Sequence, residues 1–150
     1  MGIRGLVSRW QSWTPYLQSL LRVVAAFLFM QYGTAKLFAF PAALLPNGGT
    51  VGVVSLLGVA GILEAAGGLC LFVGLFTRPV AFLLAGEMAV AYFKAHAPHG
   101  FWPLLNQGAP AVYFAFLWLF FSAAGAGPWS LDALRHAESP RPSQGSRPTH

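Results

Sequence analysis

The chain of 150 residues is 56% hydrophobic and only 9% charged, with a mean hydropathy of +0.60. Soluble domains carry about 25% charged residues, so this composition excludes a soluble globular domain and also a disordered chain. The net charge of +5 does not indicate nucleic-acid binding, because the arginines concentrate in terminal segments and in one turn. The single cysteine, Cys70, excludes an intrachain disulfide and a cysteine-based metal site. We therefore expect the lipid bilayer as this protein's solvent.

Residues 1–15 form a cytoplasmic or interfacial amphipathic segment in this interpretation. Beside Arg4 and Arg9, large apolar residues recur on one helical face, as in a helix lying in the membrane interface: Leu6, Trp10, Trp13 and Leu17. Thr14 and Pro15 then supply a helix cap and a first-turn proline, which predicts that the first span begins there.

Four apolar stretches follow, at about 16–38, 51–76, 79–97 and 108–126. Each is near the ~20 residues that cross the hydrocarbon core as a helix. The second stretch carries small residues that allow close backbone approach between helices: Gly58, Gly61, Ala65, Gly68 and Gly74. The sequence predicts an all-α integral membrane protein, a four-helix bundle over residues 16–136.

The connections between the stretches carry ordinary turn and cap residues. The short Thr77-Arg78-Pro79 link, with Thr77 as a helix cap, predicts an antiparallel hairpin between spans two and three. Pro98 to Pro103 ends span three in an aromatic interfacial loop, and Ser130 caps a short amphipathic turn through Leu134. Residues 137–150 are proline-rich and polar, which predicts a disordered tail.

The distribution of basic residues predicts the topology. If both termini lie on one side, only Lys36 and Lys94 lie near the other side, and the arginines gather with the termini: Arg4, Arg9, Arg22, Arg78, Arg135, Arg141 and Arg147. The positive-inside rule then puts both termini in the cytoplasm, with Arg78 as a topology determinant in the turn. We expect a multi-pass protein of the cell's inner (plasma) membrane.

Two acidic residues, Glu64 and Glu87, fall near the middle of spans two and three. An unpaired charge there costs about 2.5–3.5 kcal/mol, so both need compensation. At about 1.5 Å per residue from the expected span ends, Arg22 reaches Glu87 and Lys94 reaches Glu64, whereas Lys36 lies too far outward for either. Glu87 and Lys94 are also seven residues apart, which puts them on one helical face.

These charges have two interpretations. They can be structural ion pairs among Arg22, Glu87, Glu64 and Lys94 that fix helix rotation and register. They can also form a polar site for a redox ligand, a proton path or a partner's charged helix. His96 and His99 have an H-x-x-H spacing, but Pro98 breaks the helix that would align them, so we expect no metal.

Several short motifs in order resemble the DoxX family of small bacterial membrane proteins with four helices. The likeness runs from about Leu21 to Leu134. Its pieces are Gly33-Thr-Ala-Lys36-Leu-Phe38, Gly61-Ile-Leu-Glu64, Gly74-Leu-Phe-Thr77-Arg78-Pro79, Glu87-Met-Ala-Val-Ala-Tyr92-Phe93 with His96, Gly100-Phe-Trp-Pro103-Leu-Leu-Asn106 and Gly127-Pro-Trp-Ser130-Leu-Asp132. The resemblance implies an inner-membrane four-helix bundle, in a family with links to quinone-coupled sulfur oxidation and to membrane oxidoreductase complexes.

Our first hypothesis is a membrane subunit or accessory of a quinone-linked oxidoreductase system. Lys94 and His96 would donate hydrogen bonds to a quinone, with Lys36 and Asn106 as further ligand-binding residues. Glu64, Glu87 and His96 would relay protons as the catalytic groups. Because the sequence shows no redox-centre motif, electrons would come from a partner subunit or a cofactor.

Two alternatives belong to other functional classes. The protein can be a non-enzymatic scaffold or assembly factor whose polar faces engage another protein's helices. Under either hypothesis the expected partners are the lipid bilayer and a redox enzyme subunit or a second copy of the chain. A small-solute or proton-coupled transporter is less favoured, because the acids lie in spans two and three and span one offers Arg22 and Lys36, which repel cations.

Overall fold

A computed structural model describes residues 3–44 and 48–137, and the regular structure in these ranges is entirely helical. Of the predicted tail, residues 137–150, Ala137 is the last residue of a helix and residues 138–150 lie outside the described ranges. Three helices are long and apolar enough to cross a membrane: Val7–Phe38, Leu56–Val73 and Thr77–His99. A fourth apolar helix, Ala109–Ala124, is shorter.

Each of the second and third of these helices is interrupted by a π-helical turn. In chain order the elements are α1 (Ile3–Phe38), α2 (Leu56–Ile62), the π-helical turn η1 (Leu63–Gly67), α3 (Gly68–Val73), α4 (Thr77–Ala91), the π-helical turn η2 (Tyr92–His96), the short 3₁₀ helix η3 (Ala97–His99), α5 (Ala109–Ala124) and α6 (Leu131–Ala137).

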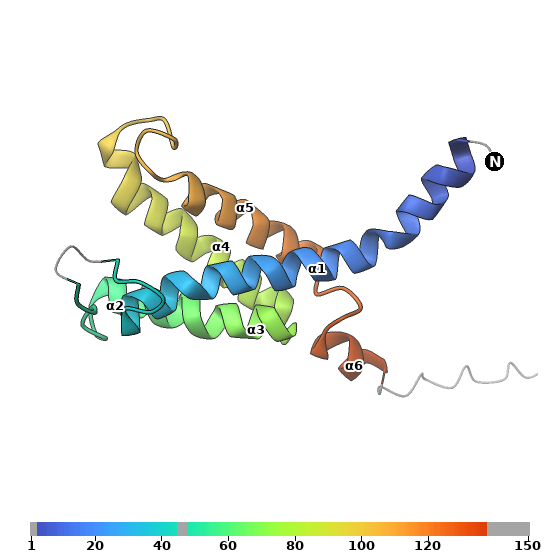
Figure 1. Ribbon diagram of the computed structural model, residues 1–150, viewed down its shortest axis with the longest axis horizontal. Helices are drawn as coiled ribbons and strands as arrows, with labels where there is room; N and C mark the ends of the chain where they lie inside the picture. The colour runs from blue at the N-terminus through green and yellow to red at the C-terminus, as the bar shows by residue number, and fades with distance from the viewer. Residues whose placement is uncertain (1–2, 45–47, 138–150) are drawn as a thin grey trace, which may run out of the picture.

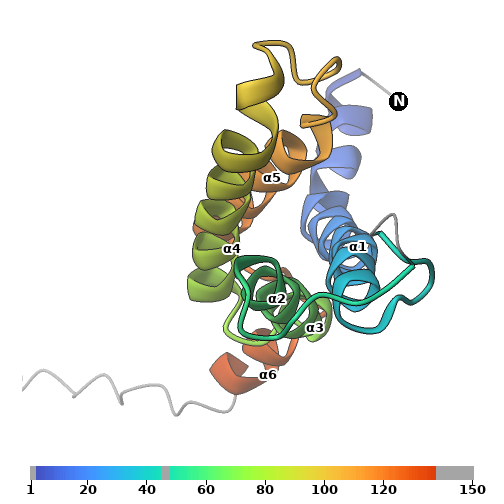
Figure 2. The same ribbon diagram turned by 90° about the vertical axis from the view of Figure 1, so that its left-hand side faces the viewer.

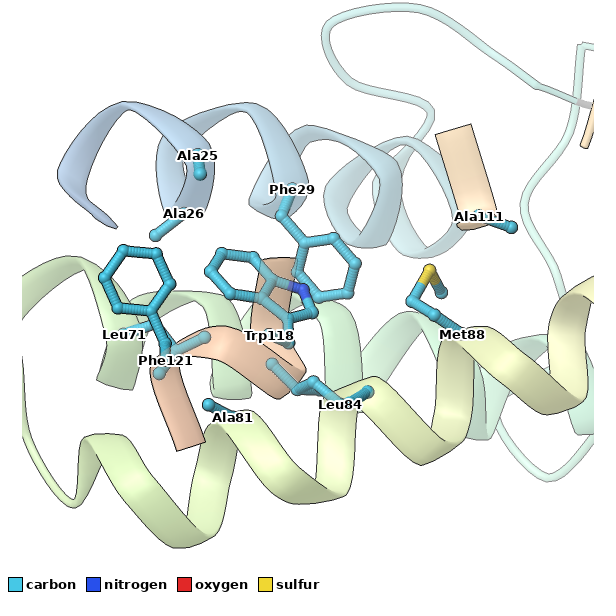
Figure 3. Packing of buried hydrophobic residues seen from close by; sticks show 11 residues of the cluster. Ala25, Ala26, Phe29, Leu71, Ala81, Leu84, Met88, Ala111, Trp118 and Phe121 are labelled. Atoms are coloured by element: carbon cyan, nitrogen blue, oxygen red, sulfur yellow. The ribbon is translucent and has the colours of Figure 1, made fainter. Parts of the chain in front are cut away.

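The helices form two packed pairs. α1 lies along the α2–η1–α3 helix and α5 lies along α4, as the two perpendicular views in Figures 1 and 2 show. Apolar side chains from all of these helices fill the space between the pairs, with Trp118 of α5 at the centre beside Phe29 of α1 and Leu84 of α4 (Figure 3). Many large apolar side chains on the outer faces are exposed, as expected for a protein whose surface contacts lipid.

The first helix begins earlier than the sequence predicts. Thr14 and Pro15 do not start a helix, because α1 runs unbroken from Ile3 and holds Pro15 in its interior. Proline removes one backbone hydrogen bond there, and Figure 1 shows the N-terminal part of α1 bending away from the bundle. Trp10 and Trp13 are exposed on this projecting part.

The hairpin between α3 and α4 is confirmed, but its cap differs from the prediction. α3 ends at Gly74 in the left-handed conformation (φ 71°), and Phe76 also has a positive φ of 50°. Thr77 is not the cap; instead the carboxylate of Asp132 accepts hydrogen bonds from the backbone N–H groups of Phe76 (2.9 Å) and Thr77 (2.8 Å). Residues 55 positions apart thus close the N-terminus of α4.

The same end of the bundle is held by Arg22, whose side chain is fully buried. Its guanidinium donates hydrogen bonds to the carbonyl oxygens of Leu71 and Phe72 (2.8 Å for the latter) at the end of α3. It also donates to those of Ala126 (2.9 Å) and Trp129 in the segment after α5. Arg22 therefore joins α1, α3 and the α5–α6 connection. The predicted ion pair between Arg22 and Glu87 is wrong.

The short helix after the bundle agrees with the sequence. α6 spans Leu131–Ala137, and the hydroxyl of Ser130 accepts the backbone N–H of Ala133 at 3.1 Å, as a capping serine does. The N–H of Asp132 donates to the carbonyl of Gly74 at 2.9 Å, which fixes α6 against the hairpin.

Replacing Arg22 by lysine keeps the charge but loses the planar fork of donors. We expect Arg22→Lys to lower the free energy of unfolding by about 2 kcal/mol, because several buried carbonyls lose a charged partner. Denaturant titration in mixed detergent micelles measures this. Arg9→Lys, at an exposed position of α1, is the matched control. Equal stabilities of the two variants would contradict the role of Arg22.

Asp132 makes the stability depend on pH. Burial alone would raise the pKa of the Asp132 carboxyl. The hydrogen bonds from Thr77 and Phe76 and the charge of Arg135 together lower the pKa by more than burial raises it, so it lies below the ordinary value of 3.8. A carboxyl with a lowered pKa stabilises the fold above its ordinary pKa, and this contribution is lost as the pH falls through the lowered value.

We expect Asp132→Ala to lower the melting temperature in detergent at pH 7 by about 2–4 °C, the scale of one lost helix cap. The difference from the wild type should shrink as the pH falls below 3.8. Asp132→Asn keeps one acceptor oxygen and should lose less. A difference that stays constant down to pH 2 would show that the carboxylate charge is not what stabilises the turn.

Candidate functional site: a buried charged cluster

Lys36 of α1 and Glu64 of η1 form an ion pair inside the apolar bundle, with Nζ 2.5 Å from Oε1. Glu64 is 2% exposed, and its second oxygen, Oε2, has no hydrogen-bond partner among the described residues. The pair forms because α1 and the second span lie very close. A Cβ on Gly33 would lie 2.5 Å from the backbone nitrogen of Ala65.

Glu64 belongs to the π-helical turn η1. Such turns are rare, and they occur often at functional sites because the extra residue changes the direction of the side chains. The widened turn lies against α4 as well as α1, so the carboxylate of Glu64 is enclosed between two other helices.

Glu87 of α4 is the third member of the cluster. Its charge interacts with those of Glu64 and Lys36, so the three groups are close enough to influence one another. Both of its carboxyl oxygens are buried and lack a hydrogen-bond partner among the described residues. The cluster therefore joins two carboxyl groups and one ammonium group. A carboxylate without a partner in an apolar interior is costly, so Glu87 must hold a proton or meet a donor from a bound molecule.

The pairing of these charges differs from the sequence-based expectation. Glu64 pairs with Lys36, which was expected to lie too far outward, and not with Lys94. Lys94 is exposed, because it lies in the second π-helical turn, η2, where the ordinary helical period no longer places it above Glu87. Arg22 lies at the level of Gly74, ten residues or about 15 Å along the span from Glu64.

His96 and Asn106 lie together at the end of the bundle opposite Arg22. The His96 ring nitrogen Nδ1 is 3.0 Å from the carbonyl oxygen of Asn106. The Asn106 side chain donates to the carbonyl of Gly100 (2.7 Å) and accepts the N–H of Gly108 (2.8 Å). Asn106 thus holds the loop between α4 and α5 and orients His96.

The structure also shows a groove that the sequence analysis did not identify. It has a volume of about 590 Å³, lies between α1, α5 and residues 41–44, and is lined mainly by apolar side chains, with Gln31, Tyr32 and Tyr113 as polar exceptions. Tyr32 lies one helical turn before Lys36, so the groove adjoins the face that carries the charged cluster. The four-residue spacing between Tyr32 and Lys36 was the feature of the sequence that could have identified Tyr32 as a candidate ligand-binding residue.

Trp118 was also not identified from the sequence as a candidate site residue. Its side chain is fully buried, and its Nε1–H has no hydrogen-bond partner among the described residues. Phe114, which lines the groove, stacks on its ring at 5.8 Å between centroids. A tryptophan in a uniformly apolar helix such as α5 gives no sequence signal that separates a core position from a polar site.

The candidate residues thus lie in three places. Glu64, Glu87 and Lys36 come together in the bundle, His96 and Asn106 lie in the loop region, and Lys94 lies on the outer surface. Arg78 is in the hairpin turn at the opposite end, where its guanidinium donates to the carbonyl oxygens of Ser122 and Ala123. In the described part of the chain, no group of three or more His, Cys, Asp or Glu side chains is placed to hold a metal ion.

Comparison with known proteins supports the family resemblance. An uncharacterized protein of Haemophilus influenzae is 43% identical over 125 residues, which cover 81% of this chain and 92% of that protein. No solved structure matches the chain. The DoxX family profile matches residues 17–97, which include α1 within the bundle, the charged cluster and both π-helical turns. The chain is a membrane protein that belongs to the DoxX family.

Proposed function

We propose that this protein is a membrane subunit or accessory of a quinone-linked oxidoreductase system. The observation that carries the proposal is the carboxyl group of Glu87, whose oxygens are buried without a hydrogen-bond partner among the described residues, beside the Lys36–Glu64 ion pair. Ionisable groups inside a membrane mark ligand sites or proton paths more often than they serve packing alone. A packing role would favour full pairing, and this cluster has one carboxyl group too many.

The groove between α1 and α5 supports a lipophilic ligand. Its apolar lining suits the isoprenoid tail of a quinone that enters from the bilayer. Tyr32 in the groove and Lys36 one turn further along α1 offer hydrogen-bond donors for the carbonyl oxygens of a quinone ring.

The chemistry needed is proton transfer, with electrons from a partner protein. Reduction of a quinone to a quinol takes two electrons and two protons, and Glu87 and Glu64 can pass protons at the ring. In this proposal His96 accepts and passes on a proton. Because a carbonyl oxygen only accepts, Nδ1 of His96 carries the hydrogen that faces Asn106, and Nε2 of the neutral ring is then a proton acceptor. Exposed Lys94 would provide a further donor near the surface.

For the topology we propose four spans with both termini in the cytoplasm, in the inner membrane. α5 has 16 residues and is about 24 Å long, so it would cross with the help of the flanking loops or locally thinner lipid. Arg78 and Arg135 lie at the same end of the bundle as Arg22, which agrees with the positive-inside rule.

The direct test is to purify the protein in mild detergent, extract it, and measure bound quinone together with an absorption spectrum. We expect stoichiometric quinone in the wild type and a loss of about tenfold in Glu87→Gln, which removes the ionisable group but keeps its size. Glu64→Gln and His96→Ala should also lose quinone. Arg9→Gln, which removes an exposed charge outside the bundle, is the control and should retain it. A well-folded wild type without quinone would contradict the proposal.

A second candidate function is a scaffold that engages another protein's helices. The observation that favours it is the N-terminal part of α1, which projects from the bundle with Trp10 and Trp13 exposed (Figure 1). In this function the charged cluster fixes helix register and binds no ligand.

A double-mutant cycle separates the two functions. Lys36→Met leaves Glu64 buried without a partner and should cost about 3–5 kcal/mol of stability, whereas Lys36→Met combined with Glu64→Gln should cost much less. If the protein is a scaffold and the pair only fixes the register, the wild type retains no quinone and the double variant regains stability. If the pair is part of the ligand site, the double variant regains stability but not quinone.

A further inference from the structure

A second cavity lies at the opposite end of the molecule from the His96 loop. It has a volume of about 610 Å³ and lies between the start of α4, the Ala124–Gly127 segment and α6. Three basic side chains line it, those of Arg78, Arg135 and His136. Neither the charged cluster nor the groove between α1 and α5 includes any of these residues.

The two arginines belong to different helices, and each makes contacts that fix its side chain. Arg78, in the first turn of α4, donates through one terminal nitrogen to the carbonyls of Ser122 and Ala123, and its guanidinium lies against Gly125. Arg135 of α6 lies over the ring of Phe76, with Cζ 4.7 Å from the ring centroid. A guanidinium has five N–H donors, so Arg78 keeps donors for an acceptor in the cavity.

The acidic group in the cavity does not neutralise this charge fully. Asp132 also lines it, but its two oxygens accept the backbone N–H groups of Phe76 and Thr77. Among the described residues that line the cavity, two guanidinium groups and the ring of His136 outnumber one carboxylate, and this lining is complementary to an anion.

The position of the cavity along the bundle indicates what kind of anion reaches it. The cavity begins where the apolar helix α4 begins, and Tyr16 and Trp129 pack together at this end of the bundle, 5.7 Å between ring centroids. Both rings are partly exposed, as is Trp13 nearby. Tyrosine and tryptophan concentrate at the level of the lipid headgroups. The cavity therefore lies at the depth of the phosphates of the adjacent leaflet, with the apolar surfaces of Phe76 and Pro79 beside its arginines.

We propose that this cavity binds the phosphate of an anionic phospholipid headgroup, with Arg78 and Arg135 as the residues that contact it. The planar guanidinium groups suit a phosphate with two oxygen acceptors, and the apolar wall accommodates the first carbons of the lipid chains. The lipid would join α6 to the start of α4 from outside, at the turn that Asp132 closes from inside.

The test measures lipid retention by native mass spectrometry of the full chain after exchange into mixed micelles. The micelles contain either phosphatidylglycerol, which is anionic, or phosphatidylcholine, which is zwitterionic. We expect the wild type to retain phosphatidylglycerol and not phosphatidylcholine. In Arg78→Gln/Arg135→Gln the affinity for phosphatidylglycerol should fall about 25-fold, because each arginine at an anionic membrane surface contributes about a factor of five. Arg9→Gln, an exposed arginine of α1 away from the cavity, is the matched control.

Two further arms keep the result decisive. Because Arg78 also bonds to the end of α5, Arg135→Gln alone provides a variant that leaves those hydrogen bonds intact, and it should lose about fivefold. Inorganic phosphate and glycerol 1-phosphate, added without lipid, test whether a free phosphate suffices. Equal retention of phosphatidylglycerol by the double variant and by Arg9→Gln would overturn the proposal. So would retention of phosphatidylcholine by the wild type, or saturation of the cavity by inorganic phosphate at low concentration.

Discussion

The buried guanidinium of Arg22 is the interaction on which the arrangement of the helices depends. It satisfies carbonyl oxygens at the end of α3 and in the segment after α5, groups that a helix end leaves without partners. Because the Arg22 side chain is fully buried, these carbonyls have no access to water as a replacement donor, so the residue fixes where these backbone segments meet. Gly74 is part of the same constraint. Its φ of 71° favours glycine, and a Cβ there would lie 2.4 Å from the Cβ of Ser130.

This junction at one end sets the register of α1 against the second span, and the register determines the charged cluster. From Arg22 beside Gly74, α1 runs antiparallel to α3, η1 and α2, so that Gly33 meets Gly61 and Ala65. The contact is close because neither Gly33 nor Gly61 has a side chain to separate the backbones. Lys36 lies less than one turn beyond Gly33, and its Nζ reaches Glu64. A buried ion pair near the end of α1 thus follows from a hydrogen-bonded junction at the other end of the bundle and a small-residue interface.

The sequence predicted the helical spans, the hairpin, the capped helix after the bundle and the family, because these depend on local periodicity, length and cap residues. It also identified Glu64 and Glu87 as the residues that need compensation. The partners were wrong because pairing depends on register, and the register was measured from an incorrect helix start at Pro15. Proline is tolerated inside a membrane helix, where neighbouring groups can satisfy the backbone that it frees. The true level of α1 is set by Arg22, and no local pattern reveals that.

The two π-helical turns account for the rest of the difference and also connect structure to chemistry. A helical wheel assumes 3.6 residues per turn, and each π-helical turn breaks that assumption inside a span. η1 turns Glu64 toward Lys36 and α4, whereas η2 moves Lys94 off the face of Glu87 and onto the outer surface. In a regular α-helix Lys94 would lie on the same face as Glu87, where its ammonium group could pair with the Glu87 carboxylate. Because η2 intervenes, the carboxyl group of Glu87 has no hydrogen-bond partner in the part of the chain that the structure describes. That imbalance makes the interior of this bundle suited to a proton or a polar ligand and not only to packing.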